Sequence, residues 1–126
     1  MQHCLVKGGR VSGLGGGIFT RDTFNQSGGN LSLWNCTADS TLWEADGGGV
    51  YSTLSFHQTS GHLVVRGCYA KNRGGAVHAW EGEQLARASA VFEDCQAGED
   101  GGAVFMTLGL QLQGHNDFIN SSALNG

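Results

Sequence analysis

The sequence predicts an all-β fold in which short strands stack in successive coils, a right-handed parallel β-helix (solenoid) of about four and a half coils of ~27 residues. Glycine is abundant, at 22 of 126 residues, and proline is absent, which argues against a proline-rich linker. In addition, one glycine phrase occurs four times, as LGGGIF, DGGGVY, RGGAVH and DGGAVF. We expect a right-handed solenoid because parallel crossovers are right-handed in nearly all proteins.

A second phrase follows each glycine phrase at an almost constant distance. Its copies are LSLWNCTA, LVVRGCYA, AVFEDCQA and NDFINSSA, with serine in place of cysteine in the last. From the first glycine of a pair to this position there are 21 residues in three copies and 20 in the fourth. From Cys4 and Cys36 to the next glycine pair there are 11 residues, but only 6 from Cys68 and Cys95. We therefore predict five inserted residues in each of the first two copies, near VSGLG and STLWE.

Each copy holds short runs of residues that favour strands. Equivalent residues should lie above one another, about 4.8 Å apart from coil to coil. The predicted columns are Ile18, Val50, Val77 and Val104; Phe19, Tyr51, His78 and Phe105; Leu33, Val65, Phe92 and Phe118; and, more weakly, Phe24, Phe56 and Leu110, with Glu83 interrupting the series.

The glycine pairs are expected to turn the chain at one corner of every coil, where a side chain would collide with the next coil. They are Gly15, Gly16, Gly47, Gly48, Gly74, Gly75, Gly101 and Gly102.

Charged residues also recur at equivalent positions, and their signs alternate. One residue before the glycine pairs stand Asp46, Arg73 and Asp100, and two before the cysteines stand Arg66 and Glu93. We interpret both series as pairs between stacked coils. A catalytic or calcium-binding group of Asp46, Arg73 and Asp100 is the alternative.

The four cysteines are expected to form one inward-facing column of buried thiols. No C-x-x-C spacing is present, so no zinc site is predicted. Disulfides between adjacent coils, such as Cys36 with Cys68, stay open as an alternative. The column would comprise Cys4, Cys36, Cys68 and Cys95.

Four N-x-S/T sequons occur, at Asn25, Asn30, Asn35 and Asn120. They are possible glycosylation sites if the chain is secreted by a eukaryotic cell. Alternatively, these residues serve turns, because Asn, Ser and Thr side chains hydrogen-bond the backbone there.

Asp94, Glu99 and Asp100 form the densest acidic group, within EDCQAGED. A hydrolase on such a fold would need two or three carboxylates placed for acid and base roles. Asp94 aligns with Asn35 and Asn120, however, so we interpret the segment as a turn and keep these three acids as a weaker catalytic alternative. No cofactor or metal is predicted.

The phrases FINSSA, FEDCQA and GGAVF resemble the paired F-x-x-N and G-G-A-[I/V] motifs of polymorphic outer membrane protein repeats. The resemblance extends over nearly the whole chain, and more broadly the chain is similar to pectin-lyase-like β-helices. It implies a right-handed parallel β-helix from a large secreted or cell-surface protein, often an adhesive one. The chain departs from the motif in having cysteine where the family commonly has asparagine.

Composition excludes several classes of function. The net charge is -4 with only 7 basic residues, so no nucleic-acid partner is expected. No apolar run approaches the roughly 18 residues of a membrane span, and no signal peptide is visible at the start.

We expect residues 1-126 to be one β-helix segment of a longer repeat protein, because SSALNG stops where another glycine pair should begin. Its expected function is that of a structural or adhesive module, extracellular or at the cell surface, without catalysis of its own. Neighbouring coils of the parent chain, a carbohydrate or another surface protein would be its partners. The alternative is a fragment of a carbohydrate-active enzyme of the pectate lyase or polygalacturonase type.

Overall fold

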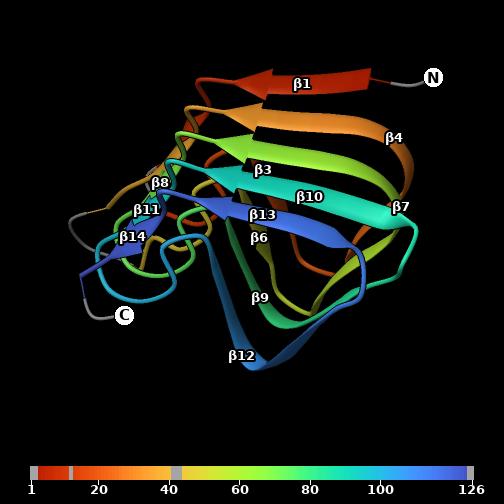
Figure 1. Cartoon of the computed structure of the whole chain (residues 1–126). Helices are drawn as coiled ribbons and strands as arrows, with labels where there is room; N and C mark the ends of the chain where they lie inside the picture. Colours follow the sequence, from red (N-terminus) through yellow and green to blue (C-terminus); the bar gives the residue numbers. More distant parts are fainter. Residues whose placement is uncertain (1–2, 12, 41–43, 125–126) are drawn as a thin grey trace.

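The computed structural model describes residues 3–11, 13–40 and 44–124, and only the backbone of residues 3, 4, 7 and 10. All regular structure in these ranges is β-strand, and all the strand pairs are parallel (Figure 1). The prediction of an all-β fold with parallel pairing is confirmed. The strands are β1 (His3–Lys7), β2 (Arg10–Val11), β3 (Ile18–Thr20), β4 (Phe24–Trp34), β5 (Thr37–Ala38), β6 (Val50–Ser52), β7 (Ser55–Arg66), β8 (Tyr69–Ala70), β9 (Val77–Gln84), β10 (Ala88–Glu93), β11 (Gln96–Ala97), β12 (Val104–Leu112), β13 (His115–Ile119) and β14 (Ser122–Ala123).

These strands form one nine-stranded and one five-stranded sheet. The larger sheet curls because the long strand β7 takes part in two runs. Its C-terminal half lies between β4 and β10, in the ladder of arrows at the front of Figure 1, while its N-terminal half pairs with β9. The five short strands pair in the order β2, β5, β8, β11 and β14. Each strand therefore pairs with its equivalents in the neighbouring coils, and the strands at the ends of a run pair on one side only.

The predicted columns are present in the register of these pairs. Ile18, Val50, Val77 and Val104 lie opposite one another in turn, and so do Leu33, Val65, Phe92 and Phe118. Their central members form the core, with Leu33 and Val65 fully buried. Aromatic rings also stack between coils, as Phe24 does on Phe56 at 5.2 Å between centroids.

The weaker predicted column is wrong at one position. Gly82, and not Glu83, lies in register with Phe56 and Leu110. The third coil has one residue, Trp80, at the corner where the neighbouring coils have two. Counting 27 residues on from Phe56 therefore gives Glu83, one residue beyond the true equivalent, Gly82. A side chain on Gly82 would meet Leu110, which fills the space inside.

The register also corrects the first copy. Cys4 pairs with Leu31, five residues before Cys36, so it does not belong to the predicted cysteine column. Because Lys7 pairs with Trp34 and Arg10 with Thr37, the residue level with Cys36 is Gly9. Gly9 precedes Gly15 by only 6 residues, so the second copy alone carries the five-residue insertion. Residue 12 of VSGLG and residues 41–43 of STLWE lie outside the described residues.

A glycine pair lies at the same corner of each coil, and each of its two positions requires glycine for a different physical reason. At the third coil, Gly74 has a backbone φ of 67°, a left-handed conformation that favours glycine. A Cβ on Gly75 would collide with the carbonyl oxygens of Gly102 and Gln96 in the next coil. The coils therefore approach one another more closely at this corner than a side chain would allow.

Inside the fold, a chain of glutamine side chains crosses three coils. Gln58 donates to Gln26 Oε1 at 2.9 Å, and Gln84 donates to Gln58 Oε1 at 2.8 Å. Asn116 continues the chain, since its side-chain amide exchanges two hydrogen bonds of 2.7 Å with that of Gln84. The Gln58 and Gln84 side chains are fully buried, and these bonds satisfy polar groups that burial would otherwise destabilise.

Candidate functional site

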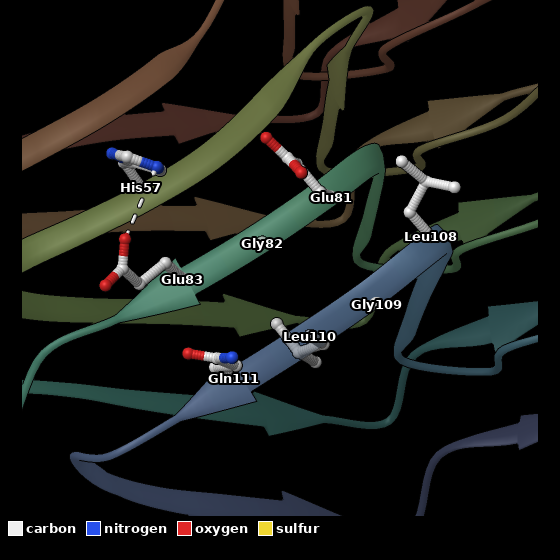
Figure 2. A pocket seen from close by; sticks show the side chains of 8 residues that line it. All are labelled: His57, Glu81, Gly82, Glu83, Leu108, Gly109, Leu110 and Gln111. Carbon is white, nitrogen blue, oxygen red and sulfur yellow. Dashed lines mark ion pairs between the residues drawn. The ribbon is translucent and has the colours of Figure 1, made fainter.

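A groove of about 500 Å³ lies on the outer surface of the curled sheet, over β9 and β12. Figure 2 shows the lining residues in place on neighbouring strands, with His57 contributed by β7. They are His57, Glu81, Gly82, Glu83, Leu108, Gly109, Leu110 and Gln111. A concave region with convergent polar groups makes this surface the candidate binding site.

The shape of the groove follows from two local features of the sequence. The register of β12 against β9 shifts between Met106 and Gly109, which places an extra residue in β12 and exposes Leu108. Gly109 lies opposite Glu81, and a Cβ there would meet nothing within 4 Å. The glycine thus leaves open space beside a carboxylate.

Two glutamates give the groove its charge. Glu81 and Glu83 are two residues apart on β9, so both side chains leave the same face of the strand, with their Cα atoms about 7 Å apart. Glu81 accepts a hydrogen bond from Ser55 Oγ at 3.2 Å, and Glu83 Oε2 lies 3.7 Å from His57 Nε2. In the described part of the chain, neither carboxylate forms an ion pair with lysine or arginine.

A second polar cluster is buried at the glycine corner. Asp46, only 1% exposed, accepts hydrogen bonds from the main-chain N–H and the side chain of Arg73, at 2.9 and 3.1 Å. His78 Nδ1 lies 3.1 Å from Asp46 Oδ2, at ion-pair distance but outside hydrogen-bond geometry. Burial acts to raise the pKa of Asp46, but the contacts with His78 and Arg73 outweigh it and hold this pKa below its ordinary value.

This cluster has the contacts of a structural element. The His78 ring packs edge-on between Tyr51 and Phe105, at 5.0 and 5.1 Å between centroids. Arg73 forms ion pairs with Asp46 and Glu44, both at 3.1 Å, and among the described residues no ion pair joins it to Asp100. The predicted series of Asp46, Arg73 and Asp100 is therefore present only in its first two members. The other predicted pair is present, with Arg66 Nε 2.6 Å from Glu93 Oε2.

The acidic group of EDCQAGED is divided among separate contacts. Asp94 has a φ of 53° and accepts a hydrogen bond from Asn120 at 2.8 Å, while Glu99 accepts one from Asn72 at 2.9 Å. The main-chain carbonyl of Asp100 accepts from Gly74 at 3.1 Å. These contacts suit the turn interpretation of Asp94, Glu99 and Asp100, and none of the three lines the groove.

Three of the four cysteines are buried and free, and they lie at successive corners. They are Cys36, Cys68 and Cys95. The main-chain N–H of Cys36 lies 3.4 Å from Cys68 Sγ, and that of Cys95 lies 3.4 Å from Ser121 Oγ, so serine takes the next place in the series. Burial raises the pKa of Cys95 to about 11. The side chain of Cys4 lies outside the described atoms.

The four sequon asparagines occupy different environments. Asn25, Asn35 and Asn120 are exposed, whereas Asn30 is half-buried. Asn35 and Asn120 have φ angles of 54° and 52°, which places both in left-handed turns, and Asn25 lies on the outer face of β4. The turn role thus has geometric support at two positions, and glycosylation stays a prediction.

Sequence reasoning missed the groove. Glu81 belongs to none of the predicted columns, and Glu83 enters them only as an interruption of an apolar series. The signal that points to them is the alternation of WEGEQ, in which two acids flank a glycine two residues apart in a strand.

Comparison of the chain with models of protein families, with curated proteins and with solved structures finds no match. Within the described residues, no helix has the length and apolar character needed to cross a membrane. No group of three or more His, Cys, Asp or Glu side chains suited to a metal ion occurs in those residues either.

Proposed function

We propose that the chain is a right-handed parallel β-helix segment that serves as a rigid binding module of a larger secreted or cell-surface protein. The observation that carries the proposal is the stacking of equivalent residues in register, coil upon coil, around a core of apolar columns and a glutamine chain. The resemblance to polymorphic outer membrane protein repeats supports the same solenoid and the same location.

A solenoid of this kind suits binding because each coil contacts only its neighbours and repeats the same outer surface. The buried columns hold the strands, so outward side chains such as Glu81 and Glu83 are free to vary without loss of the core. The groove over β9 and β12 is then the surface through which the module contacts a ligand.

Glycoside hydrolysis is a second candidate, favoured by one specific observation. Carboxyl groups in inverting glycosidases lie about 6.5–9.5 Å apart. The Glu81 and Glu83 side chains leave one face of β9 from Cα atoms about 7 Å apart, which allows their carboxyl groups to reach such a separation. A uronate polymer fits the groove poorly, because its carboxylates would face Glu81 and Glu83 while the lining contains neither lysine nor arginine. A neutral polysaccharide is therefore the substrate class for this candidate.

Retention and turnover on the same polymers separate the two candidates. The purified chain would be passed over immobilised neutral polysaccharides, polygalacturonate and a surface glycoprotein, and both bound protein and released reducing ends would be measured. Retention on at least one material without reducing ends supports the binding module. Release of reducing ends that is lost in Glu81→Gln and Glu83→Gln, but kept in Glu99→Gln, would overturn it in favour of the hydrolase.

A further inference from the structure

Exposed apolar side chains follow one another at the corner that borders the groove. Leu54, Trp80 and Leu108 are 51%, 50% and 66% exposed. They belong to three successive coils, because the N–H of Trp80 donates to the carbonyl of Leu54 at 3.0 Å and Leu108 lies in the two-residue segment of β12 that is level with Trp80. With about 4.8 Å between coils, these three residues form a ridge roughly 10 Å long, which we call the corner ridge.

The corner ridge is not needed for the core. The buried core cluster consists of other residues, and the corner residues in the first coil are Arg21 and Asp22, which are polar and exposed. Single exposed apolar residues are common on protein surfaces, but a contiguous series points to an interaction site. Tryptophan is also among the residues that most often dominate binding energies at interfaces.

The ridge and the groove form one continuous surface. Leu108 belongs to both, and Glu81 directly follows Trp80 along β9. Figure 2 shows Leu108 at one end of the groove and the two glutamates along the neighbouring strand. An apolar strip thus borders two carboxylates that, in the described part of the chain, form no ion pair with lysine or arginine.

Charge and spacing identify the chemistry of a partner for this surface. Side chains at alternate positions of an extended peptide are about 7 Å apart, the same spacing as between Glu81 and Glu83. Arginine or lysine at such positions would pair with the two carboxylates, and arginine has the better geometry for a carboxylate. An apolar side chain next to them would cover Trp80. The acidic net charge of -4 also favours the approach of a basic partner.

We propose that the groove and the corner ridge bind an extended segment of a partner protein that carries one apolar residue followed by two basic residues at alternate positions. The proposal rests on the binding-module function and names its ligand. The basic side chains lie against Glu81 and Glu83, and the apolar side chain lies on Trp80.

Fluorescence anisotropy with a labelled peptide tests the proposal. The probe has one leucine followed by two arginines at alternate positions and serine elsewhere. Two control peptides replace either both arginines by glutamate or the leucine by serine. Binding of the probe should weaken at least tenfold in the double variant Glu81→Gln/Glu83→Gln and in Trp80→Ala, and it should weaken with added salt.

Filling the groove provides an independent variant. Because a Cβ on Gly109 meets nothing within 4 Å, Gly109→Phe should fold and block the probe. The matched controls are Leu124→Ala, which removes another exposed leucine, and Glu99→Gln, which removes a carboxylate outside the groove; both should bind within twofold of the original chain. Circular dichroism would verify that every variant keeps its strands.

The possible outcomes are distinct. Equal binding of the arginine and glutamate peptides, or binding that survives Gly109→Phe, overturns the proposed ligand. If the polymer assay shows retention of a polysaccharide that depends on Glu81 while the peptide does not bind, the binding module stands and the peptide proposal fails. If reducing ends are released, the proposed function fails as well.

Discussion

Gln84 donates its side-chain amide to Gln58 Oε1 at 2.8 Å, and both side chains are completely shielded from solvent. Each glutamine occupies the same strand position one coil apart. In a parallel stack, a buried polar side chain can therefore form its hydrogen bonds with the equivalent side chain of the next coil. A single buried glutamine would have no such equivalent beside it.

Replacing the central glutamine should be costly. Gln58→Leu leaves the oxygen atoms of Gln26 and Ser89 without the donor that they share now, at 2.9 and 2.8 Å. We expect a loss of about 2 kcal/mol in the free energy of unfolding, measured with urea. Gln96→Leu is the control, because Gln96 is exposed, and it should change stability by less than about 0.5 kcal/mol. Equal effects of both changes would contradict the role of the glutamine chain.

The buried carboxylate at the corner should make stability depend on pH. Because the pKa of Asp46 is lowered in the folded state, its contribution is present above the ordinary value of 3.8 and is lost as pH falls below that value towards the folded pKa. At neutral pH, Asp46→Asn should cost about 2 kcal/mol, since Arg73 loses its buried partner and keeps only the exposed Glu44. The difference between the two chains should shrink in urea titrations below about pH 4, and a constant difference would refute this origin.

Two glycines should respond in opposite ways to the same substitution. Gly75→Ala forces a methyl group against the Gly102 carbonyl and should destabilise the chain by about 3 kcal/mol. Gly109→Ala places the methyl group in open space and should be neutral or stabilising by a few tenths of a kcal/mol. Thermal unfolding of both variants measures the contrast, and similar melting temperatures would show that the close approach of the coils is not required.

The thiols should be free and unreactive in the folded chain. A hydrogen bond between Cys36 and Cys68 lowers the pKa of Cys36 to about 6 and, together with burial, raises the pKa of Cys68. The thiols of Cys36, Cys68 and Cys95 are nevertheless all buried, so reagents in solution do not reach them in the folded chain. Under denaturing, non-reducing conditions we expect four titratable thiols, including Cys4. In the native chain, the three buried thiols should react with the reagent only when the chain unfolds. Fewer than four thiols would reveal a disulfide and point to maturation in an oxidising compartment.

Much of the frame could be predicted from sequence because its causes are local and repeated. The columns of Val50 and Val65 follow from strand alternation plus a fixed interval, and Gly75 follows from the close approach of two coils. The predicted repeat was wrong at Cys4 because the copies were aligned by their cysteines, whereas Gly9 is the residue level with Cys36. The register is set by Lys7 and Arg10 pairing with the next coil, and single-sequence periodicity does not report such pairing.

The site was harder to predict because it depends on a difference between the coils and not on what they have in common. Glu81 and Glu83 face the groove because the third coil has one residue fewer at its corner than the coils on either side. A search for self-similarity treats such a difference as noise. The paired acids and the exposed Trp80 are visible in the sequence, but only the register shows that they meet Leu108 and Gly109 on one surface.

The corner at Trp80 has a further consequence for how such a chain can change. Between Ala79 and Glu81 one residue completes a turn for which the adjacent coils use two, yet from Glu81 onwards β9 resumes the alignment with both neighbours. A gain or loss of residues at this point is absorbed within a single turn and does not propagate to the interior. Insertions and deletions at such a corner can therefore change the outer surface without any change in the buried columns. The surface of such a chain can evolve independently of its core.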